Sequence, residues 1–169
     1  MHYGNASKWK ETLLQYDDSD GQLSLLNIPE ELGVDLNGAL IAQINQSVFA
    51  LKQGEQVHCL RLDELETKNP IMTQLATLER RGYWFAIAAD SGRYIFLTGG
   101  QSEAGELASA LDTRANRWID LPRLNHPREA HSSMVIGLHL YVIGGSGVGT
   151  IEGLNYVHGT AWVVLVEHS

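Results

Sequence analysis

The chain has 169 residues, of which 44% are hydrophobic and 19% are charged, and this composition is typical of a globular domain with a core of its own. Its formal net charge of −8 repels phosphate backbones, so we expect no binding to nucleic acid. No window approaches about eighteen uninterrupted apolar residues, so we expect no membrane contact through a spanning helix.

The first expected element is a pair of strands at about residues 11–28. Tyr16 and Asp17 close the first of these strands, an Asp-Gly turn follows, and Pro29 ends the second strand. Because the same spacing recurs further along the chain in four-stranded units, this pair predicts the second half of such a unit.

Three complete four-stranded units are expected after this half unit. Each has strands a, b, c and d in antiparallel order, joined by tight turns of the kind that hairpins use. Strand a is expected at residues 39–44, 83–88 and 132–136, and strand b at 48–51, 94–97 and 140–143. The units therefore span about 38–76, 82–122 and 130–166.

A glycine doublet follows strand b in the last two units. Gly99 and Gly100 recur as Gly144 and Gly145, 45 residues later. Two successive glycines permit a positive φ and a close approach of backbones, which a Cβ would prevent where a strand turns outward. We therefore assign these four glycines a structural role.

A tryptophan marks strand d of the same two units. Trp118 recurs as Trp162 after 44 residues, and we expect both rings to be buried between neighbouring sheets. Asp112 and Asn155 precede these tryptophans, and their side chains can bond the backbone two residues on and close the c to d turn. A period near 45 residues is typical of repeated four-stranded units that stack as propeller blades.

The last two units resemble Kelch repeats, clearly over residues 81–166 and more weakly upstream. The residues that carry the resemblance are Gly99, Gly100, Leu111, Asp112, Asn116, Trp118, Leu121, Pro122, Arg128, His131 and residues 140–145. It implies an all-β fold, a partial β-propeller of about three and a half four-stranded antiparallel blades in one segment, 1–169. It also implies that Arg128 and His131 form hydrogen bonds inside their blade.

An open stack of this kind leaves the outer apolar faces of its first and last sheets without cover. Kelch relatives commonly have about six blades, whereas this chain supplies about three and a half. We expect protein partners to cover these faces, as a hetero-complex, as a homo-oligomer, or as the missing part of a longer polypeptide.

The connections from strand b to c and from d to a are expected at one face of the propeller, where binding normally resides. They are short and polar, which favours a protein ligand over a buried small-molecule pocket. The candidate partner-binding residues are Gln101, Ser102, Glu103, Glu106, Asn125, His126 and Ser146.

No catalytic, cofactor-binding or metal-binding residue is predicted. The histidines lack the spacing of a zinc site, and the glycine doublets precede strands rather than the helix that a phosphate loop requires. Cys59 is the single cysteine, which fits a reducing compartment, and we expect a cytoplasmic location.

The favoured hypothesis is a non-catalytic scaffold of Kelch type that mediates protein–protein interaction as a subunit or fragment completed by other chains. A rival hypothesis is a propeller-type enzyme whose site forms only in the assembled ring. A third is the substrate-recognition part of a ubiquitin-ligase adaptor that lacks its recruiting domain.

Overall fold

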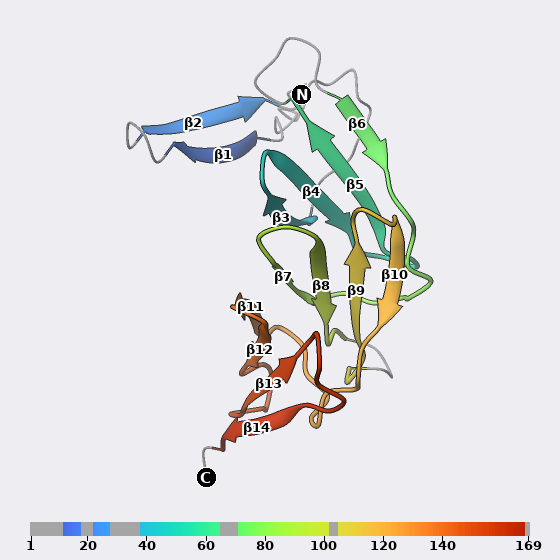
Figure 1. Cartoon of the computed structure of the whole chain (residues 1–169), viewed down its shortest axis with the longest axis vertical. Coiled ribbons are helices and arrows are strands. Elements are labelled where there is room, and N and C mark those ends of the chain that lie inside the picture. Colours follow the sequence, from blue (N-terminus) through green and yellow to red (C-terminus); the bar gives the residue numbers. More distant parts are fainter. Residues whose placement is uncertain (1–11, 18–21, 28–37, 65–70, 102–104, 168–169) are drawn as a thin grey trace, which may run out of the picture.

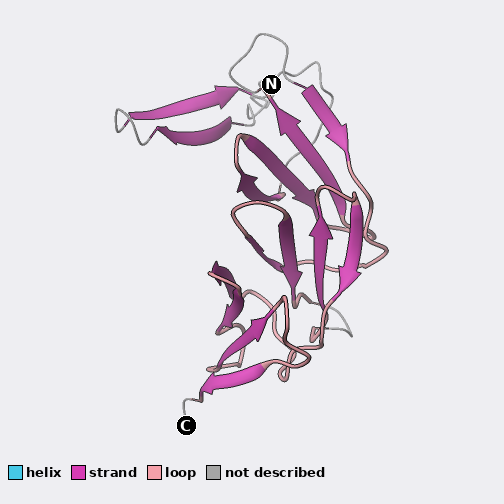
Figure 2. Ribbon diagram, viewed as in Figure 1, coloured by secondary structure: helices cyan, strands magenta, loops and turns pink. Residues whose placement is uncertain are grey.

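The computed structural model describes residues 12–17, 22–27, 38–64, 71–101 and 105–167. Within these ranges the regular elements are the strands β1 to β14, and none of them is a helix (Figures 1 and 2). The prediction of an all-β fold is therefore confirmed. The described part of the chain contains no helix long and apolar enough to cross a membrane.

The amino-terminal strands form a sheet of their own. β1 (Thr12–Asp17) and β2 (Gln22–Asn27) pair antiparallel, with Thr12 opposite Asn27. Two strands were expected in this stretch. That they are the second half of a blade stays a prediction.

The first four-stranded sheet is a meander in which each strand pairs with the next along the chain. All of its strand pairs are antiparallel. The sheet corresponds to the first expected unit, in which the Kelch resemblance is weak. Its strands are β3 (Leu40–Ile44), β4 (Ser47–Lys52), β5 (His58–Asp63) and β6 (Ile71–Gln74).

The second sheet repeats this meander. Its strands are β7 (Ala86–Ala89), β8 (Tyr94–Thr98), β9 (Ala108–Asp112) and β10 (Arg117–Asp120). The prediction that strand a begins at Tyr83 was wrong by three residues. Trp84 has a φ of 58°, a left-handed conformation that cannot continue a strand, so regular pairing starts only at Ala86.

The third sheet has the same strand order. Its strands are β11 (Ser132–Ile136), β12 (His139–Ile143), β13 (Ile151–Asn155) and β14 (Val163–Val166). Strand a was predicted here with the bounds that the structure shows. Trp162 precedes β14 rather than lying within it, whereas Trp118 lies inside β10.

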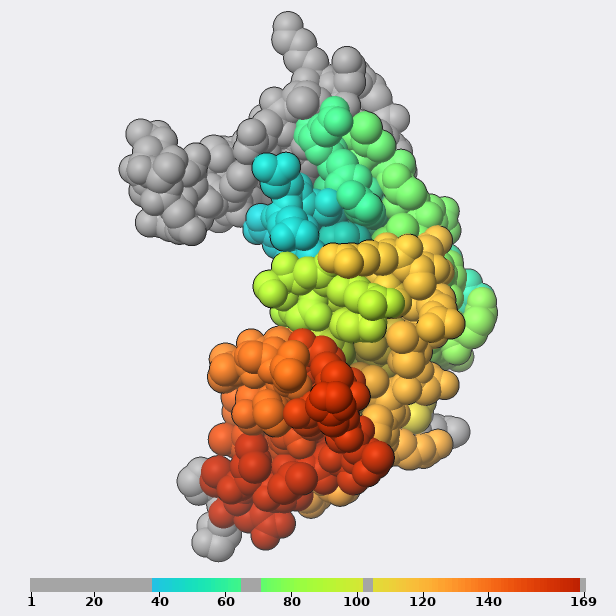
Figure 3. Space-filling model, viewed as in Figure 1, coloured from blue at the N-terminus to red at the C-terminus, as the bar shows by residue number. Residues whose placement is uncertain are grey.

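The three sheets stack face to face in chain order, so that the molecule is an arc of three layers (Figures 1 and 3). One apolar cluster joins the first sheet to the second, and it includes Phe49, Leu51, Ile95 and Leu97. A second cluster joins the second sheet to the third. It includes Phe96, Ala110, Leu140, Val142, Leu154 and Trp162. The second sheet thus buries both of its faces.

The two tryptophans lie at these junctions. Trp118 is half-buried against the first cluster and its indole Nε1 donates to the carbonyl of Ala76, 2.8 Å away, beyond the last strand of the first sheet. Trp162 is 4% exposed and donates in the same way to the carbonyl of Pro122 at 2.8 Å. The expectation that both rings pack between neighbouring sheets is confirmed.

The side chain of the first residue closes each turn between strands c and d, as expected. Asp112 Oδ1 accepts the backbone N–H of Arg114 at 3.1 Å, and Asn155 Oδ1 accepts that of Val157 at 3.1 Å. Asp112 also accepts two hydrogen bonds from the Arg93 guanidinium, at 3.0 and 2.6 Å. These bonds hold the pKa of Asp112 well below its ordinary value.

The glycine doublets adopt the left-handed backbone that the sequence predicted. Gly99 and Gly100 have φ of 61° and 110°, and Gly144 and Gly145 have 66° and 116°. A Cβ on Gly100 would overlap the ring of Phe85, whereas a Cβ on Gly144 would meet no atom closer than 3.9 Å. Steric contact therefore adds to backbone strain at Gly100 but not at Gly144.

This difference predicts graded effects of alanine substitution on stability. Gly100→Ala should lower the free energy of unfolding by about 3 kcal/mol, and Gly144→Ala by about 1 kcal/mol from backbone strain alone. Gly92→Ala is the control, because nothing lies within 4 Å of its Cβ position and its φ is not positive. Urea unfolding followed by circular dichroism measures the three values, and equal losses at Gly100 and Gly92 would contradict this explanation.

Candidate functional site

The b to c and d to a connections meet at one end of the sheets and bond across them. Gly54, after β4, accepts from the backbone N–H of Gly82, before β7, at 3.0 Å. Gly100, after β8, donates to the carbonyl of Arg128, before β11, at 2.8 Å. The prediction that these connections share a face is confirmed. Each of the two hydrogen bonds links one sheet to the next.

Three of the predicted contact residues are exposed in these connections, namely Gln101, Asn125 and Ser146. The backbone N–H of Gln101 donates to Tyr83 O at 2.7 Å, and that of Ser146 donates to Glu129 O at 3.0 Å. In both cases the backbone is fixed and the side chain is left to solvent.

The predicted acidic loop is only partly described. Ser102 and Glu103 lie outside the described residues. Glu106 is half-buried and accepts a hydrogen bond from Arg123 Nη1 in an ion pair. Its carboxylate is thus engaged with a neighbour on the same chain.

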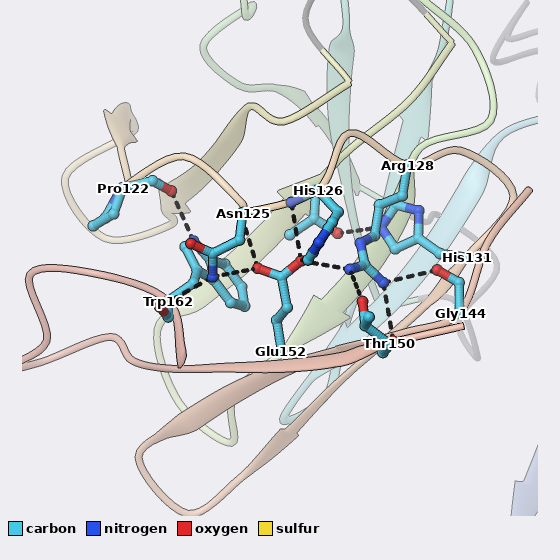
Figure 4. Close-up of polar contacts among 10 residues, drawn as sticks. Pro122, Asn125, His126, Arg128, His131, Gly144, Thr150, Glu152 and Trp162 are labelled. Carbon is cyan, nitrogen blue, oxygen red and sulfur yellow. Dashed lines mark hydrogen bonds and ion pairs between the residues drawn. The ribbon is translucent and has the colours of Figure 1, made fainter. Parts of the chain in front are cut away.

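Asn125 and His126 point inward, toward a buried carboxylate that the sequence interpretation did not single out (Figure 4). Glu152, on β13, is fully buried, and its Oε2 accepts from the backbone N–H of Asn125 at 2.7 Å and from Asn125 Nδ2 at 2.9 Å. Its Oε1 accepts from the backbone N–H of His126 at 3.2 Å and from Arg128 Nη2. These residues form the Glu152 cluster.

Arg128 connects this cluster to the glycine turn. Its Nη1 donates to the carbonyls of Gly144 at 2.8 Å and Thr150 at 3.2 Å, and its Nη2 donates to Thr150 Oγ1 at 2.8 Å (Figure 4). All of these partners belong to the third unit. Arg128 therefore bonds inside its own blade, as the Kelch resemblance implied.

The cluster fixes the charge of Glu152. Burial disfavours the carboxylate, but hydrogen bonds from the Asn125 backbone, Arg128 and His126 outweigh it, so the pKa of Glu152 lies below its ordinary value. The buried anion is matched by a buried guanidinium, and both side chains are inaccessible to solvent. The arrangement explains how the d to a segment is held. Asn125 and His126 bond to Glu152 and still reach solvent, since Asn125 is exposed and the His126 side chain is 40% exposed.

The second unit places an arginine in the same way. Arg80 Nη2 donates to the carbonyls of Gly99 and Leu107, the latter at 3.1 Å, as Arg128 does to Gly144 and Thr150. Burial lowers the pKa of Arg80 to about 10, although nearby carboxylates oppose the shift. The sequence interpretation missed Arg80 because the spacing differs. Arg80 lies 19 residues before Gly99, whereas Arg128 lies 16 residues before Gly144.

His131 does not bond inside its own sheet, so that prediction was wrong. Its Nε2 lies 2.8 Å from Thr98 Oγ1 on β8, in the preceding sheet, and Thr98 Oγ1 lies 2.6 Å from Ser133 Oγ. Strand a of the third sheet faces the end of β8, so the imidazole spans the junction. Burial, with the nearby charge of Arg128, lowers the pKa of His131 to about 4.

The outer face of the third sheet is apolar and open. Side chains alternate across a sheet, and those that face the second sheet are buried. On the opposite side, large apolar side chains are 38–59% exposed. They are Met134, Ile136, Ile143, Val163 and Leu165, and we call them the outer face.

Metal-binding and thiol chemistry find little support among the described residues. Within them, no three His, Cys, Asp or Glu side chains gather where they could hold a metal ion. Cys59 is buried, which raises the pKa of its thiol to about 12 and disfavours the reactive thiolate.

Comparison with known proteins supports the fold. No family model matches the chain, and no curated protein matches it in sequence. The solved structure of YjhT, a Kelch-repeat protein, matches with a TM-score of 0.62 at 14% identity, over 78% of this chain and 51% of YjhT. At this identity the match shows a Kelch-propeller-like fold of partial blades, and the chain spans about half the length of YjhT.

The Glu152 cluster predicts a large loss of stability when the ion pair is broken. Glu152→Gln leaves the buried charge of Arg128 uncompensated and should lower the free energy of unfolding by about 3–5 kcal/mol. The double variant E152Q/R128M removes both charges and should recover part of that loss. Urea unfolding of both variants measures the difference, and a double variant no more stable than Glu152→Gln would argue against charge imbalance as the cause.

His131 predicts sensitivity to acid. Because its folded pKa of about 4 lies below the ordinary 6.5, the unfolded chain binds the proton first, and stability falls as the pH drops from about 6.5 toward 4. The loss should reach about 2 kcal/mol by pH 5. His131→Gln should show a correspondingly smaller decline over this window in thermal melts. An unchanged decline would place the acid sensitivity elsewhere.

Proposed function

We propose that this chain is a non-catalytic scaffold that binds other proteins, and that the outer face of the third sheet packs against an apolar sheet of a partner. The observation that supports this proposal most strongly is the exposure of that face. A soluble monomer seldom leaves so continuous an apolar sheet face in water.

Pairing across the third sheet places these side chains on one surface. Met134 is opposite Tyr141 on the neighbouring strand, and Gly153 pairs with both Tyr141 and Val163. A Cβ on Gly153 would lie 3.2 Å from Leu165 Cδ1, so Leu165 lies over this glycine. The glycine keeps the middle of the surface low, and apolar side chains surround it, which suits a flat, packed interface.

The first sheet differs at the other end of the stack. Alternation places Ala50 and Leu62 on its far side, away from the second sheet, yet they are 0% and 1% exposed. These two side chains are therefore closed to solvent, whereas Ile41, which pairs with Ala50 at the edge of the sheet, is 41% exposed. This contrast favours the third sheet as the surface that a partner covers.

The sheet that covers the outer face can come from two sources. A propeller blade packs its apolar face on that of the next blade, as the second sheet does on both sides. The partner sheet belongs either to a separate chain or to further polypeptide joined to this one. About half of YjhT lies outside the match, which leaves room for such additional blades.

The proposal predicts that charge on the outer face abolishes association. Wild-type protein should self-associate beyond its mass of 18.7 kDa and bind the dye ANS, because no residue in the described part of the chain covers this face. The double variant V163K/L165K should remain near 18.7 kDa and bind several-fold less ANS, with an unchanged circular dichroism spectrum. Light scattering coupled to gel filtration measures the mass.

Leu138→Lys is the matched control. Leu138 is 50% exposed but lies in the turn between β11 and β12, so it should not change association. A wild-type monomer that melts cooperatively without binding ANS would contradict the proposal, as would an equal effect of Leu138→Lys. If the proposal holds, loss of ANS binding on addition of a purified partner chain would identify a separate chain as the source of the covering sheet. Loss of ANS binding on extension of the polypeptide would identify further blades of the same chain.

A further inference from the structure

One backbone position has a left-handed conformation at the entry to each of the three sheets. Gly38, Trp84 and Ala130 have φ of 68°, 58° and 50°, and each is 46 residues from the next. The turn is therefore part of the repeat. Glycine adopts it without strain and alanine at a modest cost, whereas a bulky aromatic residue rarely does so.

Burial does not explain the tryptophan at this position. Trp84 is 53% exposed and its neighbour Tyr83 is 51% exposed. A ring that is half in solvent gains less from burial than a core residue does, and here the backbone strain opposes that gain. Strained residues persist at sites where function requires them.

The surrounding contacts hold the two rings outward. The carbonyl of Tyr83 accepts from Gln101 N–H at 2.7 Å, and that of Trp84 accepts from Ala130 N–H at 3.2 Å. Phe85, the next residue, points the other way. It is 4% exposed, its N–H donates to Gln53 Oε1 at 3.2 Å, and the Arg80 guanidinium lies 4.9 Å from its ring centre.

The charges near the pair favour a cation. Glu129 precedes Ala130, which bonds to Trp84, and among the described residues its carboxylate has no ion pair. Of the two cations next to this segment, Arg81 is paired with Glu55 at 3.1 Å, and Arg80 is buried with its guanidinium against the Phe85 ring. The chain carries a net charge of −8, and the faces of Trp and Tyr rings attract cations.

We infer that Tyr83 and Trp84 form a recognition site for an arginine or lysine side chain of a polypeptide partner, with Glu129 supplying the opposite charge. The site lies at the loop face and is distinct from the outer face of the third sheet. It does not require that outer face to be an interface.

The test uses a nine-residue peptide with three arginines. In the control peptide, citrulline replaces each arginine, because citrulline is uncharged and of similar shape. The arginine peptide should shift the Trp84 indole N–H signal in NMR spectra, assigned by its loss in Trp84→Ala. The citrulline peptide should bind roughly tenfold more weakly, and Trp84→Ala should also lose roughly tenfold in affinity. Glu129→Gln should reduce binding to a smaller extent.

Equal binding of the two peptides would overturn the inference, and so would unchanged binding to Trp84→Ala or an indole signal that does not move. The experiment is repeated in V163K/L165K, which should bind the arginine peptide as the wild type does. Failure of this site is then separable from failure of the outer face. Stronger binding of the citrulline peptide would indicate an uncharged ligand instead.

Trp84→Gly separates function from folding. Because glycine accepts the left-handed backbone, relief of strain should offset the lost packing of the ring, so this variant should melt within about 4 °C of the wild type while losing the peptide. A larger drop in melting temperature would show that the tryptophan is kept for stability and would overturn the inference drawn from strain.

Discussion

The structure depends on one constraint: a flat antiparallel sheet of four strands has two sides, and its own strands cannot cover either. In the second sheet, Phe96 and Leu97 are adjacent in β8, point to opposite sides, and are both buried. Each side of this sheet is covered by a neighbouring sheet. The stack therefore continues until something else closes it, and in the third sheet Met134 and Leu165 lie where it stops.

Polar contacts also join the sheets that the apolar clusters hold together. His131 reaches back to Thr98 on the preceding sheet, and the Trp118 indole reaches back to Ala76. At the glycine turns of the second and third units, by contrast, a buried arginine donates to the turn carbonyls. Because these charged and polar groups are engaged internally, we attribute to them the shape of the scaffold, and we look for function in exposed side chains.

Much of this fold could be predicted from the sequence, because its repeated residues act locally. A glycine pair such as Gly144 and Gly145 needs only its own backbone, and Asp112 closes a turn with residues beside it. The Glu152 cluster could not be predicted, since a carboxylate in a strand is buried only if a distant loop supplies donors. The left-handed Trp84 was missed for a related reason, because its backbone is held by a hydrogen bond from Ala130, 46 residues further along the chain.

The most direct test of the open outer face is hydroxyl-radical footprinting of Met134, read by mass spectrometry. It compares the isolated monomer at high dilution with the assembled protein recovered from cells. Met134 is 44% exposed in the isolated chain, and we expect assembly to protect it several-fold while Met72 in the first sheet is unaffected. Equal oxidation of Met134 in both samples would contradict the claim that a partner sheet covers this face.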